Sequence, residues 1–289
     1  MNKREQILDA LGDVTPLPAS TGRLLSLVND PDAPMATIAQ IVEQDHALAA
    51  NILRLVNSSY YSPSQPVGSV RDAITRIGLL QVARIATSNS IAPMTNQPVM
   101  GYDLNAGDLW SSSLSMAIAT EELAKLRKVK PPVECFTAGL LADVGKLVLG
   151  RFVGSQIDMV RSVAFEQGLP FDEAEREVLG IDHCEVGAEL LRCWKLPDAL
   201  IEVVRWHHDP EQASDFVRDA VDMVHAASQL IIIMGVGSGS DGVHYRTSSE
   251  TIDRMHISSA IVEQAISRTM AVRDEVLGLY EPANERKSL

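Results

Sequence analysis

The sequence is poor in aromatic residues and has no long apolar runs. Phe, Trp and Tyr make up 4% of the 289 residues, so the core must be built mainly from aliphatic side chains and methionine. Such a core suits packed helices better than a β-sandwich, which favours aromatic and β-branched residues. No segment shows the alternation of apolar and polar residues that is typical of a strand. We therefore predict an all-α fold.

Cysteine is scarce, and the N-terminus carries no targeting signal. Cys135, Cys184 and Cys193 are odd in number, widely spaced and without a CxxC pair, which argues against a disulfide framework or a zinc knuckle. Residues 1–14 lack the apolar segment of a signal peptide. The longest apolar run, Leu230–Met234, is too short to cross a bilayer. We expect a cytoplasmic protein without membrane contact.

Acidic residues outnumber basic residues, and most of the excess lies after residue 100. The net charge is −13; the first 100 residues carry 7 Lys and Arg against 8 Asp and Glu, and the remainder carries 18 against 30. A large acidic field repels phosphate backbones, so generic nucleic-acid binding is disfavoured. The same field suits metal ions or basic protein surfaces, but it also simply favours solubility.

Helical periodicity and helix-start signals recur along the chain. Leu48, Ile52, Leu55 and Val56 fall on one helix face. Capping-box spacing predicts helix starts at Thr37, Ser69 and Asp182. Three segments are expected to be loops: Ser62–Gly68, Pro93–Gly107 and Gly235–Tyr245. The last is rich in Gly and Ser, and we interpret it as a mobile connection rather than a lid.

Familiar catalytic and DNA-binding motifs are missing or weak. The sequence contains no P-loop, no GxGxxG after a strand, no GxSxG and no HExxH. Residues 37–58 could form a helix-turn-helix, but the second helix offers Arg54 alone for phosphate contacts. A basic surface would need Arg71, Arg76 and Arg84 as well, and the last two could share a helix face. A transcriptional regulator therefore stays open as an alternative.

Four phrases in the N-terminal part carry a family resemblance. TPLPAS (Thr15–Ser20), IVEQDHAL (Ile41–Leu48), ILRLVNSSYY (Ile52–Tyr61) and VRDAITRIGL (Val70–Leu79) stand in the order and spacing typical of HDOD domains. These are bacterial signalling relatives of the HD and HD-GYP phosphohydrolases. The resemblance covers roughly residues 10–280, with one departure at His46, where the family usually has proline. It implies an N-terminal helical subdomain (1–100) packed on an HD-like helical bundle (101–289).

The residues of these phrases also have structural interpretations. Asp45 stands between two predicted helices and can cap the second. Asn57 follows an apolar helix and can end it. Gly78 would permit close helix packing. We therefore expect these positions to serve the fold or a partner surface rather than chemistry.

The resemblance also implies a metal site that has lost ligands. HD enzymes hold divalent metals with His and Asp side chains, and the metal activates water and polarises a phosphoryl oxygen. Here Ser112 stands where such enzymes carry a histidine, and Ala142 replaces the histidine of the HD dyad. Ser228 stands at the position of their last aspartate. Hydroxyl and methyl groups cannot hold the ion. The GYP tripeptide is absent.

Four residues survive as residual metal-ligand candidates: Asp143, His183, His207 and His208. Consecutive residues on a helix point about 100° apart. We therefore expect only His207, and not His208, to face the core. We expect no cofactor and no bound metal, but a remnant polar network in which Asp143 accepts hydrogen bonds from the histidines. Cys184 is interpreted as a core residue.

The resemblance favours a non-enzymatic module of bacterial signal transduction that acts by protein–protein contact. Its partners would be other signalling proteins or, as a homo-oligomer, further copies of itself. Two alternatives are kept. One is a residual metal-dependent phosphohydrolase acting on a nucleotide or cyclic dinucleotide; the other is the DNA-binding regulator. The sequence names neither the partner nor the signal.

Overall fold

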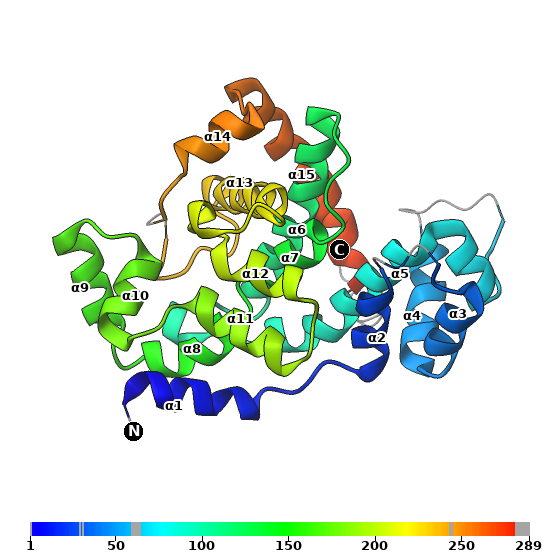
Figure 1. Ribbon diagram of the computed structural model, residues 1–289, viewed down its shortest axis with the longest axis horizontal. Coiled ribbons are helices and arrows are strands. Elements are labelled where there is room, and N and C mark those ends of the chain that lie inside the picture. The colour runs from blue at the N-terminus through cyan, green and yellow to red at the C-terminus, as the bar shows by residue number, and fades with distance from the viewer. Residues whose placement is uncertain (1, 29, 31, 59–64, 243–244, 281–289) are drawn as a thin grey trace, which may run out of the picture. The chain divides into compact units, whose positions relative to one another are not determined.

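The computed structural model describes residues 2–28, 30, 32–58, 65–242 and 245–280 (Figure 1). All regular elements in these ranges are helices, apart from an isolated bridge between Val99 and Leu104. The prediction of an all-α fold is confirmed. Within the same ranges, every helix is too short or too polar to cross a membrane.

The chain divides into two compact units. The first combines Met1–Pro16 with Met94–Met270, and the second combines Leu17–Pro93 with Ala271–Leu289. The sequence analysis placed one boundary near residue 100, so the observed division differs at both ends of the chain. The physical reason at the N-terminus is that α1 (Lys3–Asp9) contacts α8 (Lys146–Val153) and α11 (His183–Cys193) of the first unit. An ion pair of 2.6 Å between Arg4 and Glu185 supports this contact.

The second unit combines short amphipathic helices with parts of longer helices. Its elements are α2 (Ala19–Leu27), α3 (Met35–Glu43), α4 (His46–Val56), most of α5 (Val70–Thr95) and the last part of α15 (Ser259–Tyr280). Helix α3 contacts both α2 and α4. The predicted apolar face of α4 is buried: Leu48, Ile52, Leu55 and Val56 are all at most 5% exposed. Burial of this face is what stabilises so short a helix.

The predicted helix starts at Ser69 and Asp182 are confirmed, but the one at Thr37 is wrong. The Ser69 hydroxyl accepts from the Asp72 amide at 3.1 Å, and the Asp182 carboxylate accepts from the Glu185 amide at 2.6 Å. Helix α3 instead begins at Met35, directly after Pro34. Proline favours the extended conformation before a helix and has no N–H to satisfy, so the cap moves from Thr37 to Pro34, three residues upstream.

Asp45 caps α4, as predicted. Its carboxylate accepts from the Leu48 amide at 3.0 Å and from the Ser20 hydroxyl at 2.6 Å. We predict that Asp45→Ala lowers the free energy of unfolding by about 1 kcal/mol, whereas Asp45→Asn, whose amide oxygen can still accept, costs much less. Urea denaturation of both variants measures the difference. Equal losses would contradict the cap.

The same cap has a defined pH dependence. The Ser20 hydroxyl, followed by the Leu48 amide, lowers the pKa of Asp45 below its ordinary value. A carboxyl with a depressed pKa stabilises the folded state above its unfolded pKa of about 3.9 and loses that contribution as pH falls. Between pH 5 and pH 3 the free energy of unfolding should therefore fall less in Asp45→Asn than in the wild type. The difference between the two falls is the contribution of the Asp45 titration.

Asn57 and Gly78 have specific backbone roles. Asn57 ends α4, and its side-chain amide pairs with both the carbonyl and the amide of Val67, at 2.9 and 2.7 Å. Gly78 breaks the course of α5 with φ +79°. A Cβ added to Gly78 would meet no atom within 4 Å, so the expectation of close helix packing is wrong. The glycine is needed because other residues adopt a positive φ only at a cost.

The break at Gly78 also removes the basic face that a DNA-binding regulator would need. Arg76 and Arg84 lie on opposite sides of it, so eight-residue spacing no longer puts them on one face. Arg84 is buried, at 5% exposure. The Arg54 guanidinium donates to the Leu279 carbonyl oxygen. The structure thus offers no support for the predicted basic surface.

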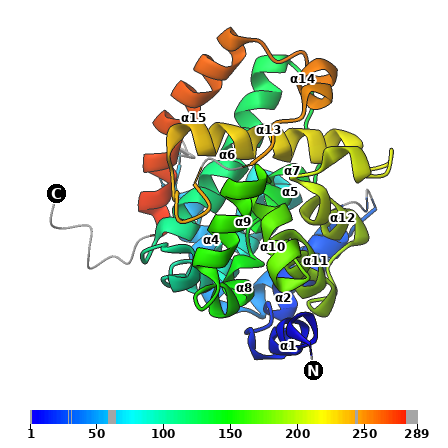
Figure 2. The ribbon, with the colours of Figure 1, turned by 90° about the vertical axis from the view of Figure 1, so that its left-hand side faces the viewer.

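The first unit is a helical bundle around a buried central helix. Its remaining helices are α6 (Asp108–Arg127), α7 (Cys135–Leu141), α9 (Ile157–Gln167), α10 (Phe171–Leu179), α12 (Asp198–Trp206), α13 (Arg218–Met234), α14 (Ser249–Met255) and the first part of α15, with short 3-10 helices at Ala10–Asp13, Met100–Tyr102 and Pro210–Gln212. Helix α13 runs between α14 on one side and α6 and α7 on the other (Figures 1 and 2). Helix α6 is buried over most of its length. Several helix ends of this bundle converge on one polar cluster.

Candidate functional site

The positions that the resemblance assigned to an HD-type site lie together in the first unit. Ser112 of α6, Asp143 between α7 and α8, His208 after α12 and Ser228 of α13 line one cavity of about 30 Å³. Ala142 is fully buried beside Asp143 in the sequence. The fold therefore brings these positions together even where the residue types have changed.

A lysine ammonium lies between two carboxylates in this cavity. Lys146 Nζ is 3.0 Å from Asp143 Oδ1 and 2.7 Å from Asp241 Oδ2, and all three side chains are at most 10% exposed. Burial alone would raise the pKa of Asp143, but the Lys146 ammonium and His183 outweigh it and lower that pKa to about 2. Burial would likewise lower the pKa of Lys146, but Asp143 and Asp241 raise it above its ordinary value. The chain thus places its own cation against the surviving aspartate.

The glycine-rich segment expected to be a mobile connection is packed against the bundle. A Cβ on Gly237 would lie 2.6 Å from the Asp108 carbonyl oxygen, and one on Gly239 would lie 2.0 Å from the Tyr102 carbonyl oxygen. The Ser240 amide donates to that same Tyr102 oxygen at 2.7 Å. The glycines are there because backbone approaches backbone too closely for a side chain.

This close approach brings two further side chains into the site. Asp241 pairs with Lys146, as described, and the Tyr245 hydroxyl donates to Asp241 Oδ2 at 2.8 Å. The Tyr245 ring stacks on His208, with centroids 4.1 Å apart and planes at 14°. Sequence analysis missed both residues. The sequence indicated them only through the glycine-rich segment that contains Asp241.

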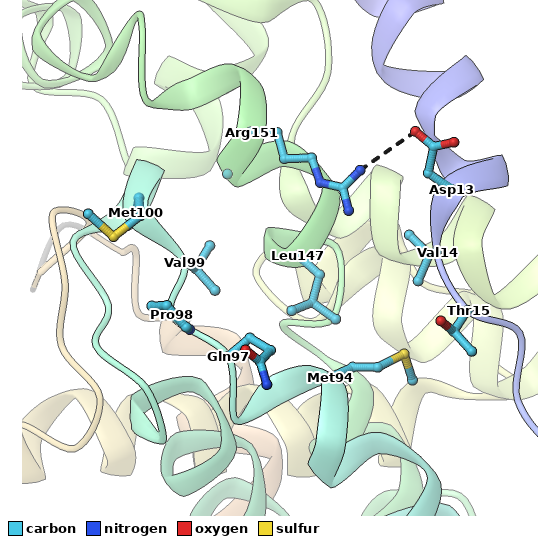
Figure 3. A pocket seen from close by; sticks show the side chains of 11 residues that line it. Asp13, Val14, Thr15, Met94, Gln97, Pro98, Val99, Met100, Leu147 and Arg151 are labelled. Carbon is cyan, nitrogen blue, oxygen red and sulfur yellow. Dashed lines mark ion pairs between the residues drawn. The ribbon is translucent and has the colours of Figure 1, made fainter.

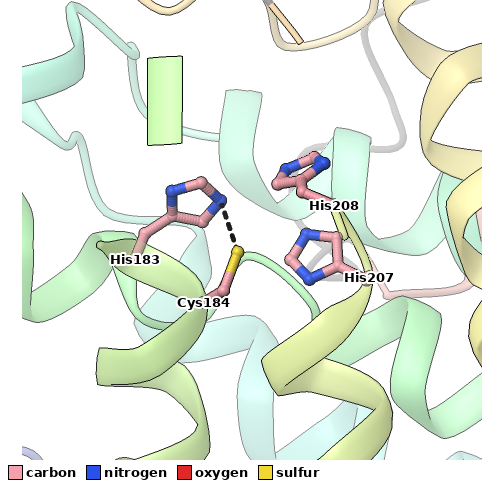
Figure 4. Close-up of side chains that lie close together, drawn as sticks. All are labelled: His183, Cys184, His207 and His208. Carbon is pink, nitrogen blue, oxygen red and sulfur yellow. Dashed lines mark hydrogen bonds between the residues drawn. The ribbon is translucent and has the colours of Figure 1, made fainter. Parts of the chain in front are cut away.

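Three histidines and a cysteine form a second part of the site, adjacent to the lysine. His183 and Cys184 begin α11, and His207 and His208 follow α12. Figure 4 shows the four side chains turned toward one another, and their donor atoms all lie within 4.8 Å of each other. All four residues are buried. We call this group the His/Cys cluster.

The expectation that only His207 faces inward is wrong. The His207 and His208 ring centroids are 4.0 Å apart, and both rings approach that of His183, at 5.8 and 5.2 Å. Helix α12 ends at Trp206, with His207 as its C-cap. The rule of 100° per residue therefore does not apply across this pair.

Hydrogen bonds on one side of two imidazole rings fix their orientation. His183 Nδ1 lies 2.8 Å from a carboxylate oxygen of Glu175, a fully buried residue that also accepts from the His183 amide and from the Tyr102 hydroxyl. His207 Nδ1 lies 2.8 Å from the Val204 carbonyl oxygen, so Nδ1 carries the proton and Nε2 is bare. Glu175 was not recognised from the sequence, which offers only its place on an amphipathic helix.

Three ring nitrogens of the cluster lack partners. Among the residues described, His207 Nε2 and both ring nitrogens of His208 accept or donate no hydrogen bond. Burial lowers the pKa of His207 to about 4, and it lowers the pKa of His208 well below its ordinary value. Both rings are therefore neutral near pH 7. Neutral imidazoles with free nitrogens are typical metal ligands, so these residues fit an ion chemically.

The thiol completes the cluster, while the aspartate lies at its edge. Cys184 Sγ is 3.5 Å from His183 Nε2, and burial raises the pKa of the thiol to about 12. Asp143 Oδ1 is 3.6 Å from His183 Nε2. The predicted hydrogen bond from His183 to Asp143 is therefore not formed at this distance.

A separate and wider cavity in the same unit has a different character (Figure 3). It measures about 360 Å³ and is lined by Asp13–Thr15, Met94, Gln97–Met100, Leu147, Gly150 and Arg151. Its only ion pair among the lining residues joins Arg151 to Asp13 at 3.7 Å, and both side chains are more than half exposed. It is distinct from the His/Cys cluster.

Comparison with known proteins finds a matching family model and several solved structures with the same fold. A family model of the HDOD domain matches residues 14–210. A crystal structure of an HDOD domain protein of unknown function from Geobacter sulfurreducens is similar over 96% of both chains, with 26% identity and a TM-score of 0.68. A protein of Marinobacter aquaeolei VT8, provisionally named for signal transduction, has 24% identity and a TM-score of 0.72 over 94% of this chain and 60% of its own.

Two other comparisons add context. A protein of Shewanella amazonensis SB2B, provisionally named a metal-dependent phosphohydrolase, shares the fold with 21% identity, a TM-score of 0.54 and coverage of 97% of this chain and all of its own. An uncharacterised protein of Treponema pallidum is 23% identical over 78% of this chain. The chain spans 43% of the length of that relative.

Proposed function

Since this chain belongs to the HDOD domain family, we propose that it is a non-catalytic module of bacterial signal transduction that acts by contact with other proteins. The name of the Marinobacter relative supports a role in signal transduction. The claim that the module lacks catalysis has its own support, which comes from the lysine-filled cavity.

The position of Lys146 carries the proposal. Its ammonium pairs with both Asp143 and Asp241 inside the cavity where HD enzymes would hold a metal. A metal ion bound to the same two carboxylates would have to displace this ammonium, which already occupies the position between them. Ser112 and Ser228, which line the cavity, contribute hydroxyl groups instead of strong metal ligands.

The size of the cavity points the same way. A volume of about 30 Å³ leaves room for roughly one or two water molecules. Sites for small organic ligands usually measure about 300–1,000 Å³. The segment carrying Gly237 and Gly239 closes the cavity by backbone contact, so admitting a phosphate ester would require that segment to move.

Exposed aromatic side chains support action through protein contact. Two of the five phenylalanines, Phe165 and Phe216, are 84% and 85% exposed. Aromatic residues are enriched in protein interfaces, where they often supply a large share of the binding energy.

Crosslinking followed by mass spectrometry tests the proposed protein contact. We expect the tagged wild-type chain, expressed in its source bacterium, to crosslink to a defined signalling protein. The variants Phe165→Ser and Phe216→Ser are compared with Lys125→Met, which changes an exposed lysine on α6. At least one phenylalanine variant should lose most of the crosslink, and the lysine variant should keep it. Undiminished crosslinking in both phenylalanine variants, or no reproducible partner, would count against this proposal.

The free imidazole nitrogens favour a residual phosphohydrolase as the second candidate. A metal held by His183, His207 and His208 would supply Lewis acidity toward a phosphoryl oxygen and an activated water. The same chain would then have to open its glycine-rich segment to admit substrate. Turnover assays with added metals separate this candidate from the non-catalytic module.

A further inference from the structure

We propose that His183, Cys184, His207 and His208 bind one transition-metal ion of the Zn²⁺ class through three imidazole nitrogens and a thiolate, and that this ion is structural. The donor set differs from the His and Asp ligands of HD enzymes, because a thiol takes part and the surviving carboxylate does not. The inference is independent of the proposed signalling role, since a structural ion serves the fold whether or not a partner binds.

The distances between the donor atoms suit a four-coordinate ion. The donors lie within 4.8 Å of one another, and the pair His183 Nε2 and Cys184 Sγ is 3.5 Å apart. Zinc binds nitrogen at about 2.0–2.1 Å and sulfur at about 2.3 Å, so two donors on a tetrahedral ion stand roughly 3.3–3.8 Å apart. Side-chain shifts of less than about 1 Å would bring the cluster to that geometry.

The unpartnered nitrogens are the second observation. His207 is fully buried and leaves Nε2 without a hydrogen bond; His208 is 91% buried and leaves both ring nitrogens without one. Burying a polar atom without a partner costs about 1–3 kcal/mol. A metal ion at the centre of the cluster would satisfy His207 Nε2 and one nitrogen of His208 together.

The outer hydrogen bonds already orient two rings as metal ligands require. Glu175 holds His183 Nδ1, and the Val204 carbonyl holds His207 Nδ1, which turns both Nε2 atoms into the cluster. Carboxylates and carbonyl oxygens commonly bind the second nitrogen of metal-ligating histidines in this way. Glu175 is thus a positioning residue for the proposed ion.

The charges explain why the fourth ligand is sulfur. Asp143 Oδ1, the carboxylate oxygen that faces His183, already pairs with the Lys146 ammonium at 3.0 Å, so it would have to leave the ammonium to bind an ion. Cys184 is free of a disulfide and buried within the cluster. On binding, the Cys184 thiol gives its proton to solvent as the metal–sulfur bond forms. His183, whose pKa burial would lower but Cys184 and Glu175 raise above its ordinary value, gives up the proton on Nε2. With four protein donors the ion has no open position, as in structural zinc sites.

Cobalt substitution tests the site through the thiolate. The metal-free full-length protein is prepared with a chelator and titrated with Co²⁺ in anaerobic buffer. We expect one Co²⁺ per chain, with the absorption of a tetrahedral ion and a thiolate-to-cobalt charge-transfer band. Zn²⁺ should displace the Co²⁺ and raise the melting temperature of the metal-free protein, because an ion that binds only the folded state stabilises it.

Two variants of α11 separate the site from adventitious binding. Cys184→Ser should lose the charge-transfer band and bind Co²⁺ roughly tenfold more weakly or worse. Cys193→Ser, which changes the exposed cysteine of the same helix, should keep both. If Cys184→Ser fails to fold, Glu175→Gln serves instead and should keep the band while weakening affinity by about 10–100-fold. Absence of the band in the wild type, or its persistence in Cys184→Ser, would overturn the proposal.

Discussion

Replacing Lys146 with methionine should lower the free energy of unfolding by about 3–5 kcal/mol. The ammonium is the buried partner of both Asp143 and Asp241, at 3.0 and 2.7 Å. Removing it leaves two carboxylates facing each other with little water, and each must then be protonated or remain unpaired. Urea denaturation followed by circular dichroism measures the loss.

A control variant separates this effect from the loss of any cation. Arg151 of α8 forms an ion pair of 3.7 Å with Asp13, and both side chains are more than half exposed. Arg151→Met should change stability by less than about 1 kcal/mol, because exposed ion pairs contribute little. Adding Asp143→Asn and Asp241→Asn to Lys146→Met should recover much of the loss. Equal stability of Lys146→Met and the wild type would mean that the lysine is not the cation of this cavity.

Gly145→Ala should be the second severely destabilising substitution, at about 3 kcal/mol or more. A Cβ at this position would lie 2.0 Å from the His183 carbonyl oxygen and 2.6 Å from the Gly187 amide nitrogen. Both neighbours are backbone atoms of α11, so no side chain can rotate away. The start of α8 and the start of α11 would have to separate, and this would displace His183 from its cluster.

Gly12→Ala is the matched control in the same unit. A Cβ at Gly12 would meet no atom within 4 Å, and its φ is not in the positive region. The change should therefore shift the free energy of unfolding by less than about 1 kcal/mol in either direction. Thermal denaturation of the two alanine variants gives the comparison. Similar melting temperatures would contradict the close backbone contact of α8 with α11.

What the sequence predicted correctly depends on local pattern. The apolar face of α4, the Asp45 cap and the starts of α5 and α11 follow from residues a few positions apart, and the structure has them. The HDOD resemblance is confirmed because its phrases are contiguous and keep their order. Local interactions of this kind are readable because helix geometry fixes which neighbours meet.

What the sequence did not reveal depends on contacts between distant residues. Lys146 and Asp241 are 95 residues apart, and neither has a motif that announces the other. Glu175 became recognisable only when the fold brought Tyr102 and His183 to it. His208 was misplaced because periodicity assumes that the helix continues, and α12 ends one residue before His207. The metal-free interpretation of the surviving histidines remains a prediction, opposed by the proposal of a structural ion.

Turnover of phosphate esters tests most directly whether the site is catalytic. The full-length protein, with Mg²⁺, Mn²⁺, Fe²⁺ or Zn²⁺ added in turn, is incubated with bis(p-nitrophenyl) phosphate and with a cyclic dinucleotide. Because Lys146 fills the cavity and about 30 Å³ remains, we predict no metal-dependent product above the protein-free control. Metal-dependent hydrolysis that disappears in His183→Ala would contradict the account and identify the chain as an active phosphohydrolase.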